Sequence, residues 1–149
     1  MRKKSLVIVI LILIVDQITK FLIVKNFNIG ESYPVIKNFF YLTYITNTGM
    51  AFGRLQSYGS ILLWFSIIVA LAIIGLLIKE KNMPRTYSLG LSFILGGAFG
   101  NIADRLIRGS IVDFFDFRIW PIFNVADSFI TVGIVLMLIN SILTKNKSL

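Results

Sequence analysis

The sequence predicts an all-α polytopic membrane protein with four transmembrane helices, and three observations support this fold class. Hydrophobic residues make up 56% of the 149 residues, whereas charged residues make up only 15%. Four long apolar segments recur along the chain, and basic residues gather in the short segments that flank them. A soluble domain of this length does not need so much apolar surface, but a polytopic membrane protein does.

Each apolar segment is about the length that crosses a ~30 Å hydrocarbon core as an α-helix. The second and fourth segments are almost continuously apolar, the first carries Asp16 and Lys20, and the third is rich in glycine with a polar end. We expect residues 1–149 to form a single membrane-embedded domain. The predicted spans are 6–24, 61–78, 87–103 and 126–143.

The basic residues orient these spans. Eight of the 15 Lys and Arg residues lie in the three short segments before the first span, between the second and third, and after the fourth. The longer loops, 25–60 and 104–125, hold six over much more chain. The positive-inside rule therefore predicts both termini in the cytoplasm and both long loops outside. The net charge of +8 is mostly a topology signal, and no continuous basic face indicates nucleic-acid binding.

The outer loops are predicted to contain local structure. Residues 39–45 and 110–117 are rich in aromatic and β-branched residues, which is typical of strands. Asn47 and Gly49 belong to a turn signal. Residues 50–55 are predicted to form a short amphipathic helix on the outer membrane surface. Together these segments predict a small extracytoplasmic β-structured element.

The chain has no His and no Cys. This excludes Ser-His and Cys-His nucleophile systems, His/Cys zinc sites and disulfides. The seven acidic residues are then the natural candidates for acid–base chemistry. Asp113 and Asp127 lie in short polar motifs beside predicted spans, and carboxylates at a bilayer boundary usually mark function.

Two carboxylates that meet share one proton, because both do not ionise easily at short range. Such a pair supplies a base that activates water and an acid that polarises a carbonyl, as peptide hydrolysis requires. Asp127 is predicted in the first turn of the fourth span, where the helix dipole favours its ionised form. Simpler interpretations remain: a helix N-terminal charge for Asp127, a solvated strand residue for Asp113 and an interfacial cap for Asn124.

Asp104 is the alternative to Asp113 as a catalytic residue. Its neighbour Arg105 offers an ion-pair partner, which favours a structural role for Asp104; Arg105 could instead donate a hydrogen bond to a substrate carbonyl. Asp116 follows Asp113 by three residues and is predicted to face solvent from the other side of a regular strand.

Asp16 and Lys20 are spaced i, i+4, so they share one face of the first span. We expect an ion pair that makes both tolerable in the membrane; the alternative is that Lys20 contacts polar groups near the site. Gly96 and Gly100 have the spacing of small residues at close helix contacts.

Five motifs in this order resemble those of the bacterial lipoprotein signal peptidases, also called signal peptidase II. The resemblance covers essentially the whole chain. The motifs are DQITK at 16–20, NTGMAF at 47–52, GNIADR at 100–105, VDF at 112–114 and FNVADS at 123–128.

The resemblance implies an intramembrane aspartyl endopeptidase. Its substrates would be diacylglyceryl-modified prolipoproteins, cut just before the lipidated lipobox cysteine. It further implies a monomer in the bacterial cytoplasmic (inner) membrane, with the active site at the extracytoplasmic face and no metal or organic cofactor. The family's catalytic aspartates map to Asp113 and Asp127. Its other polar positions map to Asp16, Lys20, Asn47, Gly49, Asn101, Arg105, Asn124 and Ala126.

A small four-helix membrane transporter is the alternative function. Such transporters usually place the essential acid deep in a span, whereas the acids here are predicted mainly at the outer face. Cleavage of a lipidated prolipoprotein distinguishes the two classes.

Overall fold

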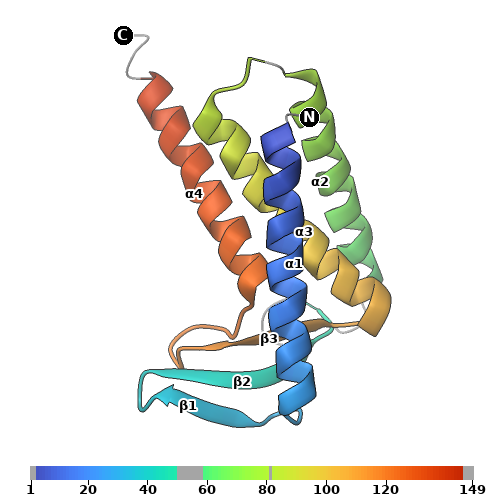
Figure 1. The fold of residues 1–149 in the computed structure, drawn as a ribbon, viewed down its shortest axis with the longest axis vertical. Helices are drawn as coiled ribbons and strands as arrows, with labels where there is room; N and C mark the ends of the chain where they lie inside the picture. Colours follow the sequence, from blue (N-terminus) through green and yellow to red (C-terminus); the bar gives the residue numbers. More distant parts are fainter. Residues whose placement is uncertain (1–2, 50–58, 81, 146–149) are drawn as a thin grey trace.

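The computed structural model describes residues 3–49, 59–80 and 82–145. In this part of the chain four helices form a bundle, and a three-stranded sheet lies across one end of it (Figure 1). The helices are α1 (Lys3–Asn26), α2 (Gly59–Lys79), α3 (Arg85–Arg108) and α4 (Val125–Lys145). The strands are β1 (Ser32–Ile36), β2 (Phe40–Asn47) and β3 (Ile111–Asp116).

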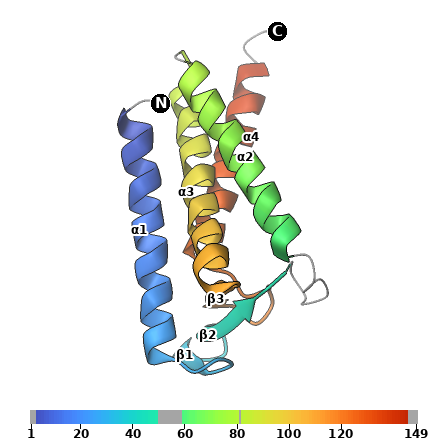
Figure 2. The ribbon, with the colours of Figure 1, turned by 90° about the vertical axis from the view of Figure 1, so that its right-hand side faces the viewer.

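Helix α3 is the centre of the bundle and packs against the three other helices (Figures 1 and 2). Its contact with α1 depends on small residues. A Cβ atom at Gly96 would lie 2.9 Å from Cβ of Ile12, and one at Gly100 would collide with the carboxylate of Asp16. The close helix packing predicted from the Gly96 and Gly100 spacing is therefore confirmed.

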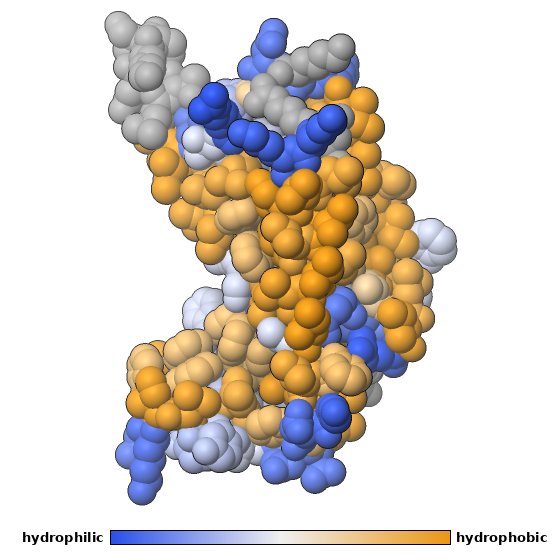
Figure 3. Space-filling view, in the orientation of Figure 1, coloured by the Kyte–Doolittle hydropathy of each residue, from blue (hydrophilic) through white to orange (hydrophobic). Residues whose placement is uncertain are grey.

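The helices carry their apolar residues outward, as a membrane protein does. Among the described residues, α1, α2 and α4 are long and apolar enough to cross a membrane. Trp64 and Phe65 of α2 are 63% and 64% exposed, which a soluble bundle would avoid. In Figure 3 an apolar band covers the helices, and hydrophilic residues gather toward the ends of the molecule. The central helix α3 is less apolar because it carries glycines, serines and a charged C-terminal end.

The sheet is antiparallel in the order β1-β2-β3. The strands predicted at 39–45 and 110–117 are confirmed as β2 and β3. Strand β1 was not predicted from the sequence; it tolerates Pro34 because it is an edge strand paired only with β2. Pairing of Asn47 with Ile111 joins the end of β2 to the start of β3. The amphipathic helix predicted at 50–55 lies outside the described residues.

The prediction that Asp116 faces solvent is wrong, because this carboxylate is buried. It accepts hydrogen bonds from the Thr43 hydroxyl at 2.7 Å and from the backbone N–H of Arg118 at 2.9 Å. The Arg118 guanidinium also pairs with it at 3.5 Å and lies 3.9 Å from the centre of the Tyr41 ring. The prediction assumed a face of the sheet open to water, but Arg118 folds back over that face.

Candidate active site

A pocket of about 350 Å³ lies among α2, α3, α4 and the paired ends of β2 and β3. Its lining combines polar and apolar residues, which we call the polar wall and the apolar wall, so the pocket offers polar groups beside side chains suited to apolar chains. The polar wall contains Asn47, Gly49, Asn101, Arg105, Asp113 and Asp127; the apolar wall includes Leu62, Phe65, Val69 and Ile130.

Asp113 of β3 reaches this pocket with a carboxylate that is almost completely buried. It accepts hydrogen bonds from Nδ2 of Asn124 at 2.6 Å and from Nδ2 of Asn47 at 3.1 Å. Burial, followed by the nearby charge of Asp127, raises the pKa of Asp113 to about 6; the two amide donors and the charge of Lys20 act in the opposite direction. Asp113 therefore holds a proton more readily than an ordinary aspartate.

Asp127 lies in the first turn of α4 and is only partly buried. Its carboxylate accepts a hydrogen bond from Nδ2 of Asn101 at 2.8 Å and another from the backbone N–H of Asn124 at 3.3 Å. Its own N–H donates to Oδ1 of Asn124 at 2.9 Å. This reciprocal arrangement is a capping box at the start of α4. The cap interpretation of Asn124 therefore holds, and the same residue also contacts Asp113. We call Asp113 and Asp127 the aspartate pair.

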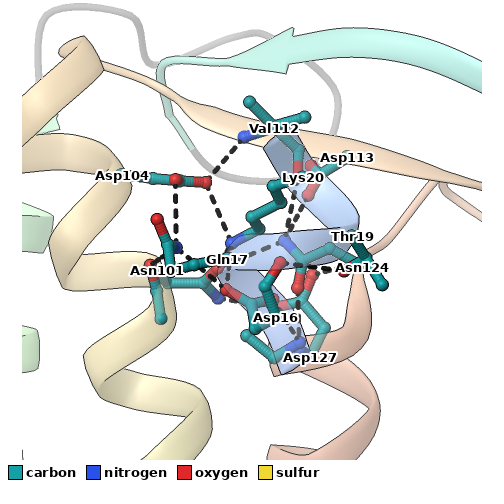
Figure 4. A network of polar contacts seen from close by, with 12 residues as sticks. Asp16, Gln17, Thr19, Lys20, Asn101, Asp104, Val112, Asp113, Asn124 and Asp127 are labelled. Carbon is teal, nitrogen blue, oxygen red and sulfur yellow. Dashed lines mark hydrogen bonds and ion pairs between the residues drawn. The ribbon is translucent and has the colours of Figure 1, made fainter. Parts of the chain in front are cut away.

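Three asparagine amides donate to the aspartate pair, and each amide has its orientation set by a donor on its oxygen. Figure 4 shows two of them, Asn101 and Asn124, beside Asp113 and Asp127. With the oxygen occupied, the NH₂ group must face a carboxylate. The oxygens of Asn47, Asn101 and Asn124 accept from Gly49 N–H, Lys20 Nζ and Asp127 N–H, at 3.1, 3.0 and 2.9 Å. The site thus surrounds its two acids with neutral donors.

Lys20 lies behind the pocket wall and is fully buried. Its Nζ atom contacts Asp16 at 2.9 Å, Asp104 at 2.9 Å and Asn101 at 3.0 Å, which uses all three of its donors. The ion pair predicted between Asp16 and Lys20 is therefore present, and so is the alternative contact of Lys20 with the site. Asp16 also accepts a hydrogen bond from the N–H of Ala126 at 2.9 Å, which ties α1 to the start of α4.

Asp104 does not pair with Arg105, contrary to the sequence interpretation. Its partners are Lys20 and Arg108, at 2.9 and 2.6 Å, and the backbone N–H of Val112 at 3.1 Å. Asp104 is fully buried and is absent from the pocket wall, whereas Arg105 lines the pocket without an ion pair to a described residue. We call the group of Asp16, Lys20, Asp104 and Arg108 the lysine network.

The structure gathers all the residues that the resemblance singled out. Six line the pocket; Asp16, Lys20, Asn124 and Ala126 lie directly behind them. Gln17 of the motif at 16–20 was not predicted as a site residue, yet its amide donates to Asp16 at 3.1 Å and to Asp104 at 3.3 Å. The pocket-lining face of α2 was not predicted either, because Ser66 is its one polar residue beside the apolar Leu62, Phe65 and Val69.

A buried acid with a raised pKa beside a second carboxylate is the arrangement that aspartic hydrolysis requires. The family model described as signal peptidase (SPase) II matches residues 8–143. The chain belongs to the signal peptidase II family. Members of this family are aspartic peptidases, so the chain is an enzyme of lipoprotein processing.

Comparisons with individual proteins agree with membership of the signal peptidase II family. The lipoprotein signal peptidase of Nostoc punctiforme is 46% identical over 128 residues, which are 85% of this chain and 81% of the relative. That of Brevibacillus brevis is 46% identical over 144 residues, covering 92% and 93%. A solved bacterial membrane enzyme superposes with a TM-score of 0.87 at 35% identity, covering 97% of this chain and 90% of its own.

Proposed function

We propose that Asp113 and Asp127 are the catalytic residues of this signal peptidase II family member. The observation that carries the proposal is that both acids line one pocket, where oriented amides hold them and no cation among the described residues forms an ion pair with them. Asp104 lines no part of that pocket and is paired with two cations, which argues against it as the second acid.

The raised pKa of Asp113 favours it as the proton holder, and this assigns the role of base to Asp127. Asp127 takes a proton from water as the oxygen attacks the scissile carbonyl carbon, while Asp113 gives its proton to the carbonyl oxygen. When the C–N bond breaks, the new amine takes a proton from Asp127, and the collapsing intermediate returns one to Asp113. The pair ends with the single proton with which it began.

The substrate is a prolipoprotein with a diacylglyceryl-modified cysteine, cut just before that cysteine. The apolar wall from α2 and α4 suits the signal segment or the lipid chains, and the polar wall suits the scissile peptide. Arg105 lines the polar wall without an ion pair to a described residue and is a suitable donor for a substrate carbonyl or lipid ester.

The enzyme works as a monomer in the bacterial inner membrane, with α3 as the fourth span and both termini in the cytoplasm. The sheet and the aspartate pair then lie at the extracytoplasmic face. Support comes from the basic residues near the opposite end of the bundle and from the apolar surface of the helices.

Purified protein incubated with a diacylglyceryl prolipoprotein tests the reaction. We expect release of the signal peptide at the bond before the lipidated cysteine, and no release from a substrate that lacks the lipid. Intact substrate, together with proton-coupled transport in vesicles, would favour the transporter function instead.

Labelling of single cysteines tests the topology, since the chain has none of its own. An impermeant thiol reagent should label Lys37→Cys on intact cells and Asn82→Cys only after lysis. The reverse pattern would place the aspartate pair on the cytoplasmic side and contradict the proposal.

A further inference from the structure

A second pocket, of about 430 Å³, lies between α1 and α3 at the end of the bundle away from the sheet. It is separate from the aspartate pair, and the proposed peptidase activity does not use it. We call it the basal pocket. Its lining residues are Lys4, Ser5 and Ile8 of α1 and Arg85, Ser88, Leu89 and Ser92 of α3.

We propose that the basal pocket binds the headgroup of an anionic membrane phospholipid. Two cations, Lys4 and Arg85, line the pocket, and no acidic residue does. Neither cation forms an ion pair with a described residue, although Lys20, Arg108 and Arg118 all do. Two unpaired cations from different helices favour an anion between them, because charge-assisted hydrogen bonds to phosphate are strong.

The serines of the basal pocket supply a further donor. The hydroxyls of Ser5 and Ser88 lie 3.2 Å apart, and both side chains are buried. Their mutual hydrogen bond uses one of the two hydroxyl hydrogens, and the other has no acceptor among the described residues. The Ser92 hydroxyl, by contrast, donates to the carbonyl oxygen of Ser88 at 2.7 Å. One hydroxyl therefore remains available to a phosphate oxygen.

The start of α3 adds a favourable dipole. This helix begins at Arg85, and Pro84 before it makes no side-chain capping hydrogen bond. No acidic residue occupies the first turn. The first N–H groups and the positive end of the dipole of this 24-residue helix are thus not compensated by a side chain, a setting that suits an anion.

The apolar surroundings indicate a lipid in place of a free anion. Ile8 and Leu89 line the pocket beside the cations. On the adjoining turns of α1, Val7 and Leu11 are 54% and 55% exposed and face outward from the bundle. The phosphate of a phospholipid would bind the cations of the pocket, and its acyl chains would contact the exposed apolar side chains of α1. Basic pockets between transmembrane helices are typical sites for anionic headgroups.

Native mass spectrometry of delipidated protein tests the proposal, with phosphatidylglycerol as the anionic probe and phosphatidylcholine as the neutral one. The wild type should bind one phosphatidylglycerol in preference to phosphatidylcholine. Each basic residue near a membrane surface strengthens anionic-lipid binding about five-fold, so Lys4→Gln/Arg85→Gln should weaken it about 25-fold. The charge-matched control Lys3→Gln/Lys79→Gln, outside the pocket, should bind like the wild type.

Equal binding by the pocket variant and the control would overturn the proposal, as would equal affinity for the two lipids. Inorganic phosphate that raises the melting temperature as much as phosphatidylglycerol would identify a free-anion site and reject the lipid. Peptide cleavage should be unchanged in the variants, which shows that they fold. If the double variant does not fold, Lys4→Gln alone should weaken binding about five-fold, and Arg85→Lys should preserve it.

Discussion

The aspartate pair and the lysine network both hold buried or partly buried carboxylates, but they lie on different elements and in opposite electrostatic settings. The aspartate pair lies on β3 and α4, and the lysine network lies on α1 and α3. In the lysine network, Asp16 and Asp104 contact two cations, so their charges are balanced. In the aspartate pair the direct partners are neutral amides and backbone N–H groups.

This difference separates a structural group from a reactive one. A cation in contact with a buried carboxylate offsets the cost of burying its charge, whereas a carboxylate held by amides beside another carboxylate can keep a proton. Burial, followed by the charge of Asp127, raises the pKa of Asp113 to about 6, and no ion pair with a described residue offsets this burial. The partner of each acid therefore predicts its role better than its burial does.

Removal of one acid from the aspartate pair is expected to have the largest effect on activity. Asp113→Asn and Asp127→Asn should each lower the cleavage rate by about 10³-fold or more, and the double variant should lose little further, because both acids serve one reaction. The assay is signal-peptide release from a lipidated prolipoprotein, beside the melting temperature of each variant. Asp116→Asn, outside the pocket, should remain active. Full activity in Asp113→Asn or in Asp127→Asn would show that the replaced residue is not catalytic.

Asp113→Asn should also stabilise the protein at neutral pH. Because the folded-state pKa of Asp113 is raised from 3.8 to about 6, the stability associated with its proton is lost as the pH rises through that range. The variant has no charge to bury and should melt higher than the wild type at pH 7. A lower melting temperature would mean that the amide breaks contacts the acid makes.

Replacement of the shared cation is expected to have the largest effect on stability. Lys20→Met leaves Asp16 and Asp104 buried without their common partner, a loss of about 3–5 kcal/mol. Adding Asp104→Asn should recover part of this loss, because it removes one of the uncompensated charges. Thermal unfolding of the two single variants and the double variant gives the coupling free energy between Lys20 and Asp104. Unchanged stability with abolished turnover in Lys20→Met would make Lys20 part of the reaction.

A smaller effect is expected when the lysine network loses one acid and keeps its cation. Asp104→Asn retains an acceptor for the Val112 N–H but loses the ion pairs with Lys20 and Arg108, which should cost about 1–3 kcal/mol and lower activity only in part. The decisive comparison is with Asp113→Asn under the same conditions. A stable, substrate-binding but inactive Asp104→Asn beside an active Asp113→Asn would make Asp104 and Asp127 the catalytic pair.

The smallest effect is expected on the pH profile. The hydrogen bond from Asn47 lowers the pKa of Asp113, so Asn47→Ala should raise that pKa above about 6. Since Asp113 acts in its protonated form, the alkaline limb of kcat/KM should move to higher pH. Ser66→Ala is the matched control, because Ser66 also lines the pocket but its hydroxyl donates to the carbonyl oxygen of Leu62 and not to Asp113. A shift to lower pH would contradict the assigned proton holder.

Hydropathy and local spacing were sufficient to predict the four helices, two of the three strands and the ion pair of Asp16 with Lys20. Hydropathy and local spacing did not predict the two cations that pair with Asp104. Adjacent residues on a helix point in different directions, so Arg105, next to Asp104, faces the pocket. Arg108 lies four residues after Asp104, on the same face of α3, and forms the ion pair with it. The second partner, Lys20, lies on another helix, and only tertiary packing brings it there.

Other differences have the same origin. Strand β1 was not predicted because it contains Pro34. Proline is tolerated in a strand only at a sheet edge, and the local sequence does not show that β1 is an edge strand. Burial of Asp116 depends on Arg118, whose backbone adopts a positive φ of 66° that local sequence did not indicate. The site residues were identified by their motifs, but the contacts that distinguish a reactive acid from a structural one cross between elements.

The hydrogen bond from Ala126 to Asp16 joins residues 110 positions apart, so it forms only after α4 has been synthesised and has packed against α1. A chain emerging from the ribosome presents α1 first and α4 last. Until α4 docks, the carboxylate of Asp16 lacks its partner on α4, Asn101 has no Asp127 to bind, and a second acid is missing. A partly synthesised chain is thus an inert membrane protein, and hydrolytic capacity arrives in one step with the final helix.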